Sequence, residues 1–366
     1  MARVLLVDLE RAWRGGQEQA LLLVAGLRGR GHCAELVAVR DSAIAWRAQA
    51  AGIRVHATPD AGRRIGAARR VRGLLREKRF DIVYANEAHA LTAAWLARSH
   101  RQAPLVAARR VVFPLSRNAI SLARYRAAAR ILAISEAVRN ELLAAGLDAN
   151  RIEVVPDGVE IPAPITPDAR ENARKRWRFR TDETVVESVG ALTAEKGHAL
   201  LIDAFAKLRR ELPNCRLLLA GEGRLRAQLE RQAREGGLAS AIVFAGFVPD
   251  VESVYAAGDL FAFPSLSEGA GSSLLRAMAY GLPVLGFARG GVAEIIEDGR
   301  TGVLEQEASA EALARAAARL LKDTDLRERL SRAARETVAS RYSADRMVDG
   351  TARIFEGLIA GKAGSQ

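Results

Sequence analysis

The segment PSLSEGAGSSLLRAMAYGLPV, residues 264–284, carries a single carboxylate, Glu268, in a glycine-rich turn before a predicted helix. Gly269 and Gly271 allow a ligand to approach the backbone, and amide groups at a helix start carry partial positive charge. A carboxylate in such a turn could accept hydrogen bonds from sugar hydroxyls, or it could cap its own helix. Arg276, which follows on that helix, can only donate hydrogen bonds.

Two other turns between a predicted strand and a predicted helix could hold a phosphate group. The segment SVGALTAEKGH places Lys196 beside a helix start, where it could contact a diphosphate or simply be solvated. The segment RGGQE places Gly15 and Gly16 at the start of the first helix, where they could admit a ligand or form a tight turn. The second segment is neither a P-loop nor a GxGxxG pattern, and the nearest match to that pattern, GEGRLR at 221–226, has Arg226 in place of the third glycine.

The elements that must position these residues alternate between strands and helices. In the N-terminal half the predicted helices are 17–29, 63–79, 89–99 and 135–145, and the predicted strands are 3–7, 34–39, 81–85, 104–108, 130–134 and 151–155. Apolar strands that alternate with helices predict a parallel sheet covered on both faces. The proline-rich segment 161–170 is predicted to be a linker, because proline is excluded from helix interiors and central strands.

The alternation restarts after this linker. The predicted strands are 184–190, 215–221, 241–246, 260–264 and 283–287, and three final helices lie near 308–321, 325–339 and 344–360. The sequence thus predicts an α/β protein with two tandem Rossmann-like domains facing a central cleft. They span 1–162 and 170–343, and a helix at about 344–366 packs back on the first. The turns described above follow strands, at the edge where such sheets bind ligands.

The overall composition limits the classes of function. The 366 residues are 49% hydrophobic, which is enough for two cores, and the start MARVLLVD has a strand pattern rather than that of a targeting peptide. No apolar segment approaches the roughly 18 residues that a membrane-spanning helix needs. Cys33 and Cys215 have no metal or redox spacing, which is typical of reduced thiols in a cytoplasmic protein.

Positive charge is concentrated in the N-terminal half. Residues 1–180 carry 32 Lys and Arg against 17 Asp and Glu, whereas residues 181–366 carry 23 against 26. Helix 63–79 has eight basic residues, and its inward face is expected to comprise Ile65, Ala68, Val71 and Leu75. Its outer face could bind an anionic membrane, where each basic residue contributes roughly 1 kcal/mol, or could simply be solvated. Nucleic-acid binding is the rival class, but the chain has no recognisable module for it.

The sequence offers no convincing metal site. The DTD segment at 323–325 resembles a DxD motif that holds a metal-bound nucleotide. It lies between two amphipathic helices, however, where Asp325 and Glu328 can form a capping box. His32, His56, His100 and His198 show no ligand spacing. We expect no metal and no cofactor.

Several segments together resemble the retaining glycosyltransferases of family 4, which have the GT-B fold of two Rossmann-like domains. The similarity is continuous from about 185 to 305 and weaker before 160. The matching segments are GGQE (15–18), AISEAV (133–138), VVPDGV (154–159), VGALTAEKGHALLIDAFAKL (189–208), LLLAGEGRLRAQLE (217–230) and VFAGFVPDVESVYAAGDLFAFPSLSEGAGSSLLRAMAYGLPVLGFARGGVAEIIEDGRTGVL (243–304).

This resemblance implies that a nucleotide-sugar donor binds the C-terminal domain and that an acceptor binds the N-terminal domain. Lys196 would contact the donor diphosphate, Glu268 would hold the transferred sugar, and the backbone near Phe247 and Val248 would frame the base. The other implied donor-side residues are Gly15, Gly16, Gly190, Gly221, Gly269, Ala270, Gly271, Ser272 and Arg276. A single visible carboxylate favours front-face transfer, in which the leaving diphosphate helps to deprotonate the acceptor.

Four residues that follow N-terminal strands are candidates for contacts with the sugar or the acceptor: Asn86, His89, Arg109 and Arg110. His89 and Arg109 are the catalytic candidates among them, beside Glu268 and Lys196. Family members often have a histidine where this chain has the two arginines, so the N-terminal catalytic residue stays open.

Two departures from the family pattern concern the donor side. The family reads E-x7-E, whose second acid contacts the donor ribose, but this chain reads Glu268-x7-Arg276; Ala191 also stands where the VGRL motif has its arginine. A guanidinium cannot accept a hydrogen bond from a hydroxyl. Arg276 could contact the nucleotide differently and alter donor preference, or it could point away or pair with an acid and weaken donor binding. Alternatively, the donor site is degenerate and the protein is a scaffold or regulatory partner.

The sequence therefore predicts a metal-independent retaining glycosyltransferase with a nucleotide-sugar donor of unknown base. Its acceptor would be a lipid-linked glycan or a glycolipid, and the reaction would belong to the synthesis of cell-envelope polysaccharide or lipopolysaccharide. The protein would be cytoplasmic and peripheral to an anionic membrane surface, without a nucleic-acid partner. A nucleotide-sugar epimerase or a phosphorylase on the same fold is the alternative, although the cofactor lysine of a phosphorylase is not apparent.

Overall fold

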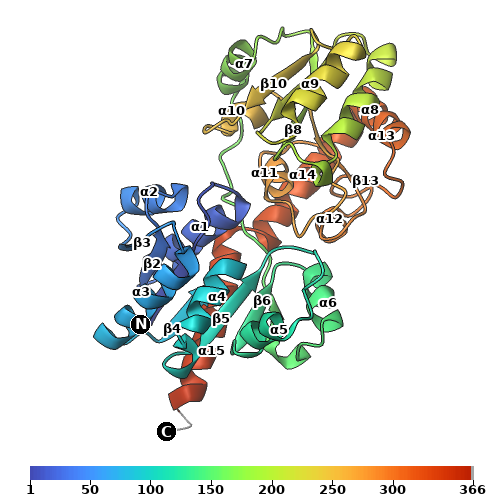
Figure 1. The fold of residues 1–366 in the computed structure, drawn as a ribbon. Coiled ribbons are helices and arrows are strands. Elements are labelled where there is room, and N and C mark those ends of the chain that lie inside the picture. Colours follow the sequence, from blue (N-terminus) through green and yellow to red (C-terminus); the bar gives the residue numbers. More distant parts are fainter. Residues whose placement is uncertain (364–366) are drawn as a thin grey trace. The chain divides into compact units, whose positions relative to one another are not determined.

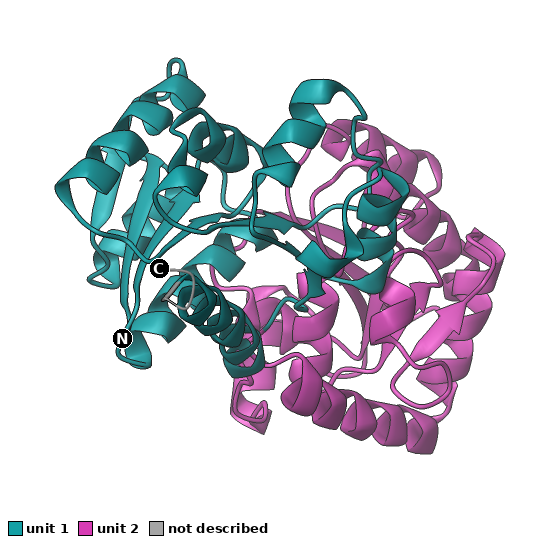
Figure 2. Ribbon diagram, turned by 90° about the horizontal axis from the view of Figure 1, so that it is seen from below, with its two compact units in different colours: residues 1–158, 344–366 teal, residues 159–343 magenta. Residues whose placement is uncertain are grey.

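The computed structural model describes residues 1–363, which divide into two compact α/β units (Figure 2). Unit 1 comprises Met1–Gly158 and the C-terminal segment from Ala344, and unit 2 comprises Val159–Ser343. Each unit is built on one parallel sheet, so the expectation of two Rossmann-like folds is confirmed. The last three residues of the predicted C-terminal helix lie outside the described part of the chain.

The sheet of unit 1 has seven parallel strands in the order β3-β2-β1-β4-β5-β6-β7. The order reverses direction beside β1, which pairs with β2 on one side and β4 on the other. The carboxyl ends of β1 and β4 therefore adjoin at the point where such sheets bind ligands. The strands are β1 Arg3–Asp8, β2 Cys33–Val39, β3 Val55–Thr58, β4 Ile82–Ala85, β5 Leu105–Arg109, β6 Arg130–Ala133 and β7 Ile152–Val154.

Helices cover both faces of this sheet (Figure 1). The final helix, α15, packs closely against α1. The close approach requires glycine at position 26 of α1, because a Cβ atom there would lie only 2.5 Å from a methyl group of Val348. Arg30 also donates hydrogen bonds to Asp349 and Asp345 of α15. The helices are α1 Gly15–Gly29, α2 Ala43–Ala50, α3 Arg63–Glu77, α4 Ala88–Leu96, α5 Ala119–Arg126, α6 Glu136–Ala144 and α15 Ala344–Ala363, with short 3-10 helices η1 Ser99–Arg101 and η2 Ala149–Arg151.

The sheet of unit 2 has six parallel strands in the order β10-β9-β8-β11-β12-β13. The strands are β8 Thr184–Val189, β9 Cys215–Ala220, β10 Ile242–Gly246, β11 Leu260–Phe263, β12 Val284–Phe287 and β13 Val303–Glu305. The helices are α7 Pro167–Arg176, η3 Ala194–Lys196, α8 His198–Glu211, α9 Arg226–Glu235, α10 Glu252–Tyr255, α11 Ser272–Ala279, α12 Val292–Ile295, α13 Ala310–Lys322 and α14 Thr324–Arg341. The adjacent strands β8 and β11 carry the two turns in which the sequence predicts a ligand site.

Three local predictions were wrong. The segment 161–170 is only partly a linker, because α7 begins at Pro167 behind a Thr166 cap, and the first helical position tolerates proline. Helix α14 is capped by Asp323, which accepts a hydrogen bond from the backbone of Leu326, rather than by the predicted Asp325. Ile65 is 56% exposed rather than inward-facing, and the buried positions of α3 are Ala67, Ala68, Val71 and Leu74.

None of the helices in the described residues is long and apolar enough to cross a membrane.

Candidate functional site

The strongest candidate site in unit 2 lies where the β8–α8 and β11–α11 turns interlock. Gly197 has a φ of 69°, and a Cβ atom at this position would lie 2.0 Å from the carbonyl oxygen of Pro264. The backbone amide of Leu266 also donates a hydrogen bond to the carbonyl of Glu195 at 2.8 Å. Only glycine fits this contact, so Gly197 allows the two turns to pack directly against each other.

Lys196 and Glu268 form an ion pair at this junction. The side chain of Lys196 is 24% exposed and that of Glu268 is 15% exposed, so both charges are partly withdrawn from water. The ammonium group also lies 5.7 Å from the ring centroid of Phe263. The structure thus brings a hydrogen-bond donor with positive charge and a carboxylate acceptor to the carboxyl ends of two adjacent strands. A phosphate and a sugar hydroxyl are ligands that suit these two groups.

A third turn fixes the backbone of Glu268. The amide of Gly291 donates to the carbonyl of Glu268 at 3.0 Å, and a Cβ atom on Gly290 would come within 2.2 Å of the same oxygen. A Cβ atom on Gly291 would meet the carbonyl oxygen of Gly269 at 2.1 Å. This glycine pair follows β12 and was missing from the predicted site. The signal for it was present, since two adjacent glycines after a buried strand indicate close backbone approach.

Helix α11 begins at Ser272, four residues after Glu268, and is not capped by it. Its N-cap is Gly271, with a φ of 104°, and no side chain of the described residues caps the helix. The amides of Ser272 and Ser273 therefore stand at an uncapped helix start, which favours an anion. Arg276 lies one turn further on, where burial lowers the pKa of its guanidinium and Tyr280 opposes this change.

Two buried polar side chains adjoin the ion pair in the sequence but were not among the predicted site residues. Burial, followed by the charge of Lys196, lowers the pKa of His198 to about 4, so its imidazole is neutral at pH 7. Within the described residues, Nδ1 of His198 and Oγ of Ser265 have no hydrogen-bond partner. Gly190 faces the imidazole, because a Cβ atom there would lie 3.7 Å from its Cε1. Unpartnered buried polar atoms are rare, and these two mark unused hydrogen-bonding capacity beside Lys196.

The remaining donor-side candidates occupy other turns. Gly221 lies against the Gly190 turn, since a Cβ atom on it would come within 1.9 Å of the carbonyl oxygen of Gly190. Val248 follows β10 and packs against a buried cluster, whereas its neighbour Phe247 is 55% exposed. Gly15 and Gly16 belong to unit 1.

In unit 1 the glycine turn is fastened to a polar network at the ends of β1 and β4. The amide nitrogen of Asn86 donates to Asp8 at 2.7 Å and to the carbonyl of Gly16 at 2.9 Å. Gln17 donates to the same Asp8 carboxylate at 3.0 Å. Burial raises the pKa of Asp8, while the hydrogen bonds from Gln17 and Asn86 lower it. Asn86 is therefore a positioning residue for the glycine turn in this arrangement.

The two candidate arginines at the end of β5, Arg109 in the strand and Arg110 directly after it, have different surroundings. Arg110 forms an ion pair with Asp157 and donates to the hydroxyl of Tyr84 at 3.2 Å and to Asn86 at 3.3 Å, so it joins the network described above. Arg109 is only 8% exposed, and its guanidinium donates to Tyr125 and to the carbonyl of Phe113. Those bonds hold the loop that follows β5.

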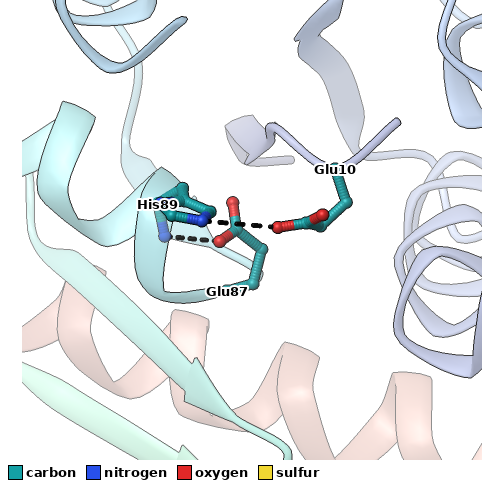
Figure 3. Close-up of side chains that lie close together, drawn as sticks. All are labelled: Glu10, Glu87 and His89. Carbon is teal, nitrogen blue, oxygen red and sulfur yellow. Dashed lines mark hydrogen bonds and ion pairs between the residues drawn. The ribbon is translucent and has the colours of Figure 1, made fainter. Parts of the chain in front are cut away.

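Glu10, Glu87 and His89 form a compact cluster beside the same strand ends (Figure 3). Glu87 caps α4, and burial followed by the charge of Asp8 raises its pKa to about 7. Nδ1 of His89 accepts a hydrogen bond from Arg64 at 2.9 Å, which places the ring proton on Nε2, 3.7 Å from Glu10. In this arrangement the Nδ1 lone pair of His89 is used by Arg64.

The cluster could offer three ligand atoms within 4.8 Å of one another, but its surroundings suit a divalent cation poorly. The Glu87 carboxylate already accepts hydrogen bonds from the backbone amides of Leu9, His89 and Ala90. A cation would also have to displace the Arg64 guanidinium from His89. These contacts describe a structural carboxylate that ties two turns together.

Comparisons with known proteins agree with this architecture. A family model described as Glycosyl transferases group 1 matches residues 169–337, and one described as Glycosyltransferase Family 4 matches residues 13–161. Alpha-D-kanosaminyltransferase of Streptomyces kanamyceticus is 31% identical over 261 residues, which are 69% of this chain and 67% of that protein. The lipopolysaccharide core biosynthesis glycosyltransferase LpsE of Rhizobium meliloti is 33% identical over 168 residues, which are 46% of this chain and 48% of that protein. HepE of Anabaena, solved in complex with UDP and glucose, has a TM-score of 0.85 at 23% identity, covering 97% of this chain and 100% of that chain.

The two parallel-sheet units therefore define a GT-B fold. The two family models match regions in both units, and the chain belongs to the glycosyltransferases of the family 4 type. The matched stretches span from about half to two thirds of the two enzyme relatives.

Proposed function

We propose that the protein is a retaining glycosyltransferase that moves a sugar from a nucleoside diphosphate donor to a glycan acceptor. The observation that carries this proposal is the Lys196–Glu268 ion pair, held by glycine-locked turns at the carboxyl ends of β8 and β11. Lys196 would bind the donor diphosphate, and Glu268 would accept hydrogen bonds from hydroxyls of the transferred sugar.

The donor class is supported by the relatives. HepE of Anabaena was solved in complex with UDP and with UDP-glucose, and a relative in Mycolicibacterium smegmatis is a GDP-mannose-dependent mannosyltransferase. A nucleoside diphosphate sugar is common to both, whereas the base differs. We therefore propose the diphosphate sugar as donor and leave its base to the titration below.

Transfer with retention is proposed to take the front-face route. The bond from the anomeric carbon to the diphosphate breaks while the acceptor oxygen bonds to the same face of that carbon. The acceptor proton passes to an oxygen of the leaving diphosphate. Glu268 is paired with a cation rather than with a second acid, which does not suit the two-carboxylate arrangement of retaining glycosidases. Lys196 and the uncapped start of α11 would neutralise the leaving group, which is why we propose a metal-independent reaction.

Arg276 is proposed to contact a phosphate or another acceptor atom of the donor, in place of a ribose-binding acid. It lies on α11 one turn after the helix start, and burial lowers the pKa of its guanidinium. A partly buried guanidinium binds an anion more strongly than a solvated one does. The degenerate-site alternative is disfavoured by the retention of both members of the Lys196–Glu268 pair.

The acceptor is proposed to be a lipid-linked glycan of the cell envelope. LpsE supports this acceptor through its role in lipopolysaccharide core biosynthesis, and the basic outer face of α3 is consistent with an anionic membrane surface. Vesicle co-sedimentation tests the second part. We expect the protein to bind anionic vesicles, with an affinity that salt lowers, and not to bind duplex DNA. Binding to duplex DNA but not to anionic vesicles would overturn the proposed membrane contact.

The donor proposal is tested by measuring the melting temperature against a panel of nucleoside diphosphates and nucleotide sugars. A ligand present at about 100 times its Kd stabilises the folded state by about 2.7 kcal/mol, which raises the melting temperature by roughly 5–10 °C. Lys196→Ala should abolish the shift. Lys207→Ala is the matched control, because Lys207 also pairs with a glutamate of unit 2 but lies on the exposed face of α8. The absence of any shift at millimolar ligand would overturn the proposal and favour a scaffold.

A further inference from the structure

A basic pocket occupies the edge of unit 1 opposite the strand carboxyl ends. It has a volume of about 760 Å³ and is lined by the C-terminal half of α3, the end of α4 and η1. The polar lining comprises Arg72, Arg76, Arg98, His100, Arg101 and Gln102, with no acidic residue among the lining side chains. Because α4 spans nine residues, the pocket lies roughly 14 Å along this helix from the Glu87–His89 end.

The arginines in this pocket differ from the stabilising arginines of the same unit. Arg30 and Arg110 each form an ion pair with an aspartate. By contrast, Arg76, Arg98 and Arg101 have no side-chain hydrogen bond or ion pair within residues 1–363. All three side chains are exposed and line one pocket that has no acidic lining residue, so an anion there could contact more than one guanidinium group.

Other features of the pocket reinforce its positive potential. Arg72 is committed to the carbonyls of Leu96 and Ala97, so it already satisfies the negative end of α4 and leaves the other arginines for another partner. Burial, then Arg101 and Arg98, lowers the pKa of His100, and its Nδ1 atom has no hydrogen-bond partner in the described chain. Lys362 adds a further cation nearby, because its ammonium donates to the carbonyl of Gln102 at 2.7 Å.

The backbone also presents these side chains in an unusual way. Arg98 has a φ of 56°, in the left-handed region that normally favours glycine or asparagine. This conformation turns the chain sharply from α4 into η1 and places Arg98, His100 and Arg101 around one opening. Beside them Trp95 and the 41% exposed Leu96 add apolar surface, which suits a ligand with a charged group next to an apolar or sugar-like body.

We propose that this pocket binds a phosphate-ester group, supplied either by the headgroup of an anionic phospholipid or by a free phosphorylated molecule. The planar forks of Arg76, Arg98 and Arg101 can each donate two hydrogen bonds to phosphate oxygens. The site is separate from the donor site, because all of its residues belong to unit 1, on the edge away from the strand carboxyl ends. Its failure would leave the Lys196–Glu268 proposal untouched.

The test uses the full chain carrying Lys196→Ala, so that binding at the donor site does not contribute, and titrates it with inorganic pyrophosphate by calorimetry. The pocket variant is R76Q/R98Q/R101Q. The matched control is R28Q/R40Q/R54Q, which removes the same charge from exposed arginines of unit 1 that lie outside the pocket. The pocket variant should bind pyrophosphate at least about 100-fold more weakly than its parent, while the control variant stays within about threefold.

The same proteins are then sedimented with vesicles of phosphatidylglycerol or of phosphatidylcholine. Loss of phosphatidylglycerol binding only in the pocket variant, with competition by pyrophosphate, identifies a lipid headgroup as the source. Pocket-dependent binding of pyrophosphate without vesicle binding identifies a free phosphorylated ligand. No pyrophosphate binding, or equal losses in the pocket and control variants, would overturn the proposal, because only diffuse charge would then be acting. Melting temperatures of all variants verify that the fold is retained.

Discussion

The substitution Glu268→Gln should distinguish the role of Lys196 in binding the diphosphate from the role of Glu268 in sugar transfer. The carboxylate competes with a donor diphosphate for Lys196, and its negative charge lies close to the phosphates in the proposed complex. The amide of glutamine has nearly the same shape but no charge. The variant should therefore bind a nucleoside diphosphate more tightly, although it should transfer sugar far more slowly.

The size of the effect follows from the burial of the pair. With side-chain exposures of 15% and 24%, an effective dielectric constant of about 20 applies, and two unit charges about 4 Å apart attract by about 4 kcal/mol. Rehydration of the ammonium, salt screening and the remaining amide hydrogen bond reduce this attraction to roughly 1–2 kcal/mol. Since 1.4 kcal/mol is about tenfold in affinity, we expect binding of the nucleoside diphosphate to tighten by roughly tenfold.

Calorimetry with the nucleoside diphosphate gives the affinity, and a transfer assay with the matching nucleotide sugar gives kcat and KM. Loss of a group that acts on the sugar in the transition state should lower kcat by at least about 100-fold. Glu311→Gln is the control, because Glu311 pairs with Lys207 on the exposed surface of the same unit. If Glu268→Gln weakens diphosphate binding as much as it slows transfer, Glu268 acts by holding the turn rather than by contacting the sugar.

Three further predictions concern stability. The pKa of Glu87 is about 7 in the folded state and 4.5 ordinarily, so the protonated carboxyl group contributes a stability that is complete below pH 4.5 and is lost as the pH rises through 7. In urea unfolding of unit 1, the free energy of unfolding should fall by up to about 3 kcal/mol across this window in the wild type, and this fall should be absent in Glu87→Gln. The pKa of His198 is lowered from 6.5 to about 4, so the neutral imidazole contributes a stability to the fold that is complete above pH 6.5 and is lost as the pH falls through 4. The difference in free energy of unfolding between the wild type and His198→Gln should shrink across that window by up to about 3 kcal/mol. Gly197→Ala should destabilise unit 2 by well over about 1 kcal/mol and weaken donor binding, whereas Gly237→Ala, with a similar φ of 68° but open space, should cost only about 1 kcal/mol; equal effects would refute the packing argument.

The sequence predicted the strands and the turns that follow them better than it predicted contacts between turns. The longer strands β1 and β9 contain continuous apolar runs, 4–7 and 217–220, whose pattern indicates buried parallel strands, whereas the run in β8 is interrupted by Glu187 and Ser188. The short strands β3 (VHAT) and β13 (VLE) were missed, since neither has more than two consecutive apolar residues, whereas the equally short β11 (LFAF) was found because it is apolar throughout. Helix α7 was missed because proline was treated as a helix breaker without regard to its position.

The candidate site shows the same division. Lys196 and Glu268 could be found from the sequence because each follows a strand in a glycine-rich turn. Their pairing could not be found in this way, because it depends on β8 and β11 being neighbours in the sheet, and 71 residues separate the two side chains in the chain. The contacts of Gly290 with Glu268 and of Gly197 with Pro264 are likewise properties of strand order.

The basic N-terminal half illustrates why charge counts do not locate a site. Its excess of arginine includes Arg110, which pairs with Asp157 inside a polar network, and Arg72, which satisfies the carbonyl end of α4. These guanidinium groups stabilise the fold and have little capacity left for a ligand. Arg76, Arg98 and Arg101 have none of these partners, yet nothing in the sequence distinguishes them from the others. What makes an arginine available for binding is the absence of a carboxylate or carbonyl within its reach, and that follows only from tertiary contacts.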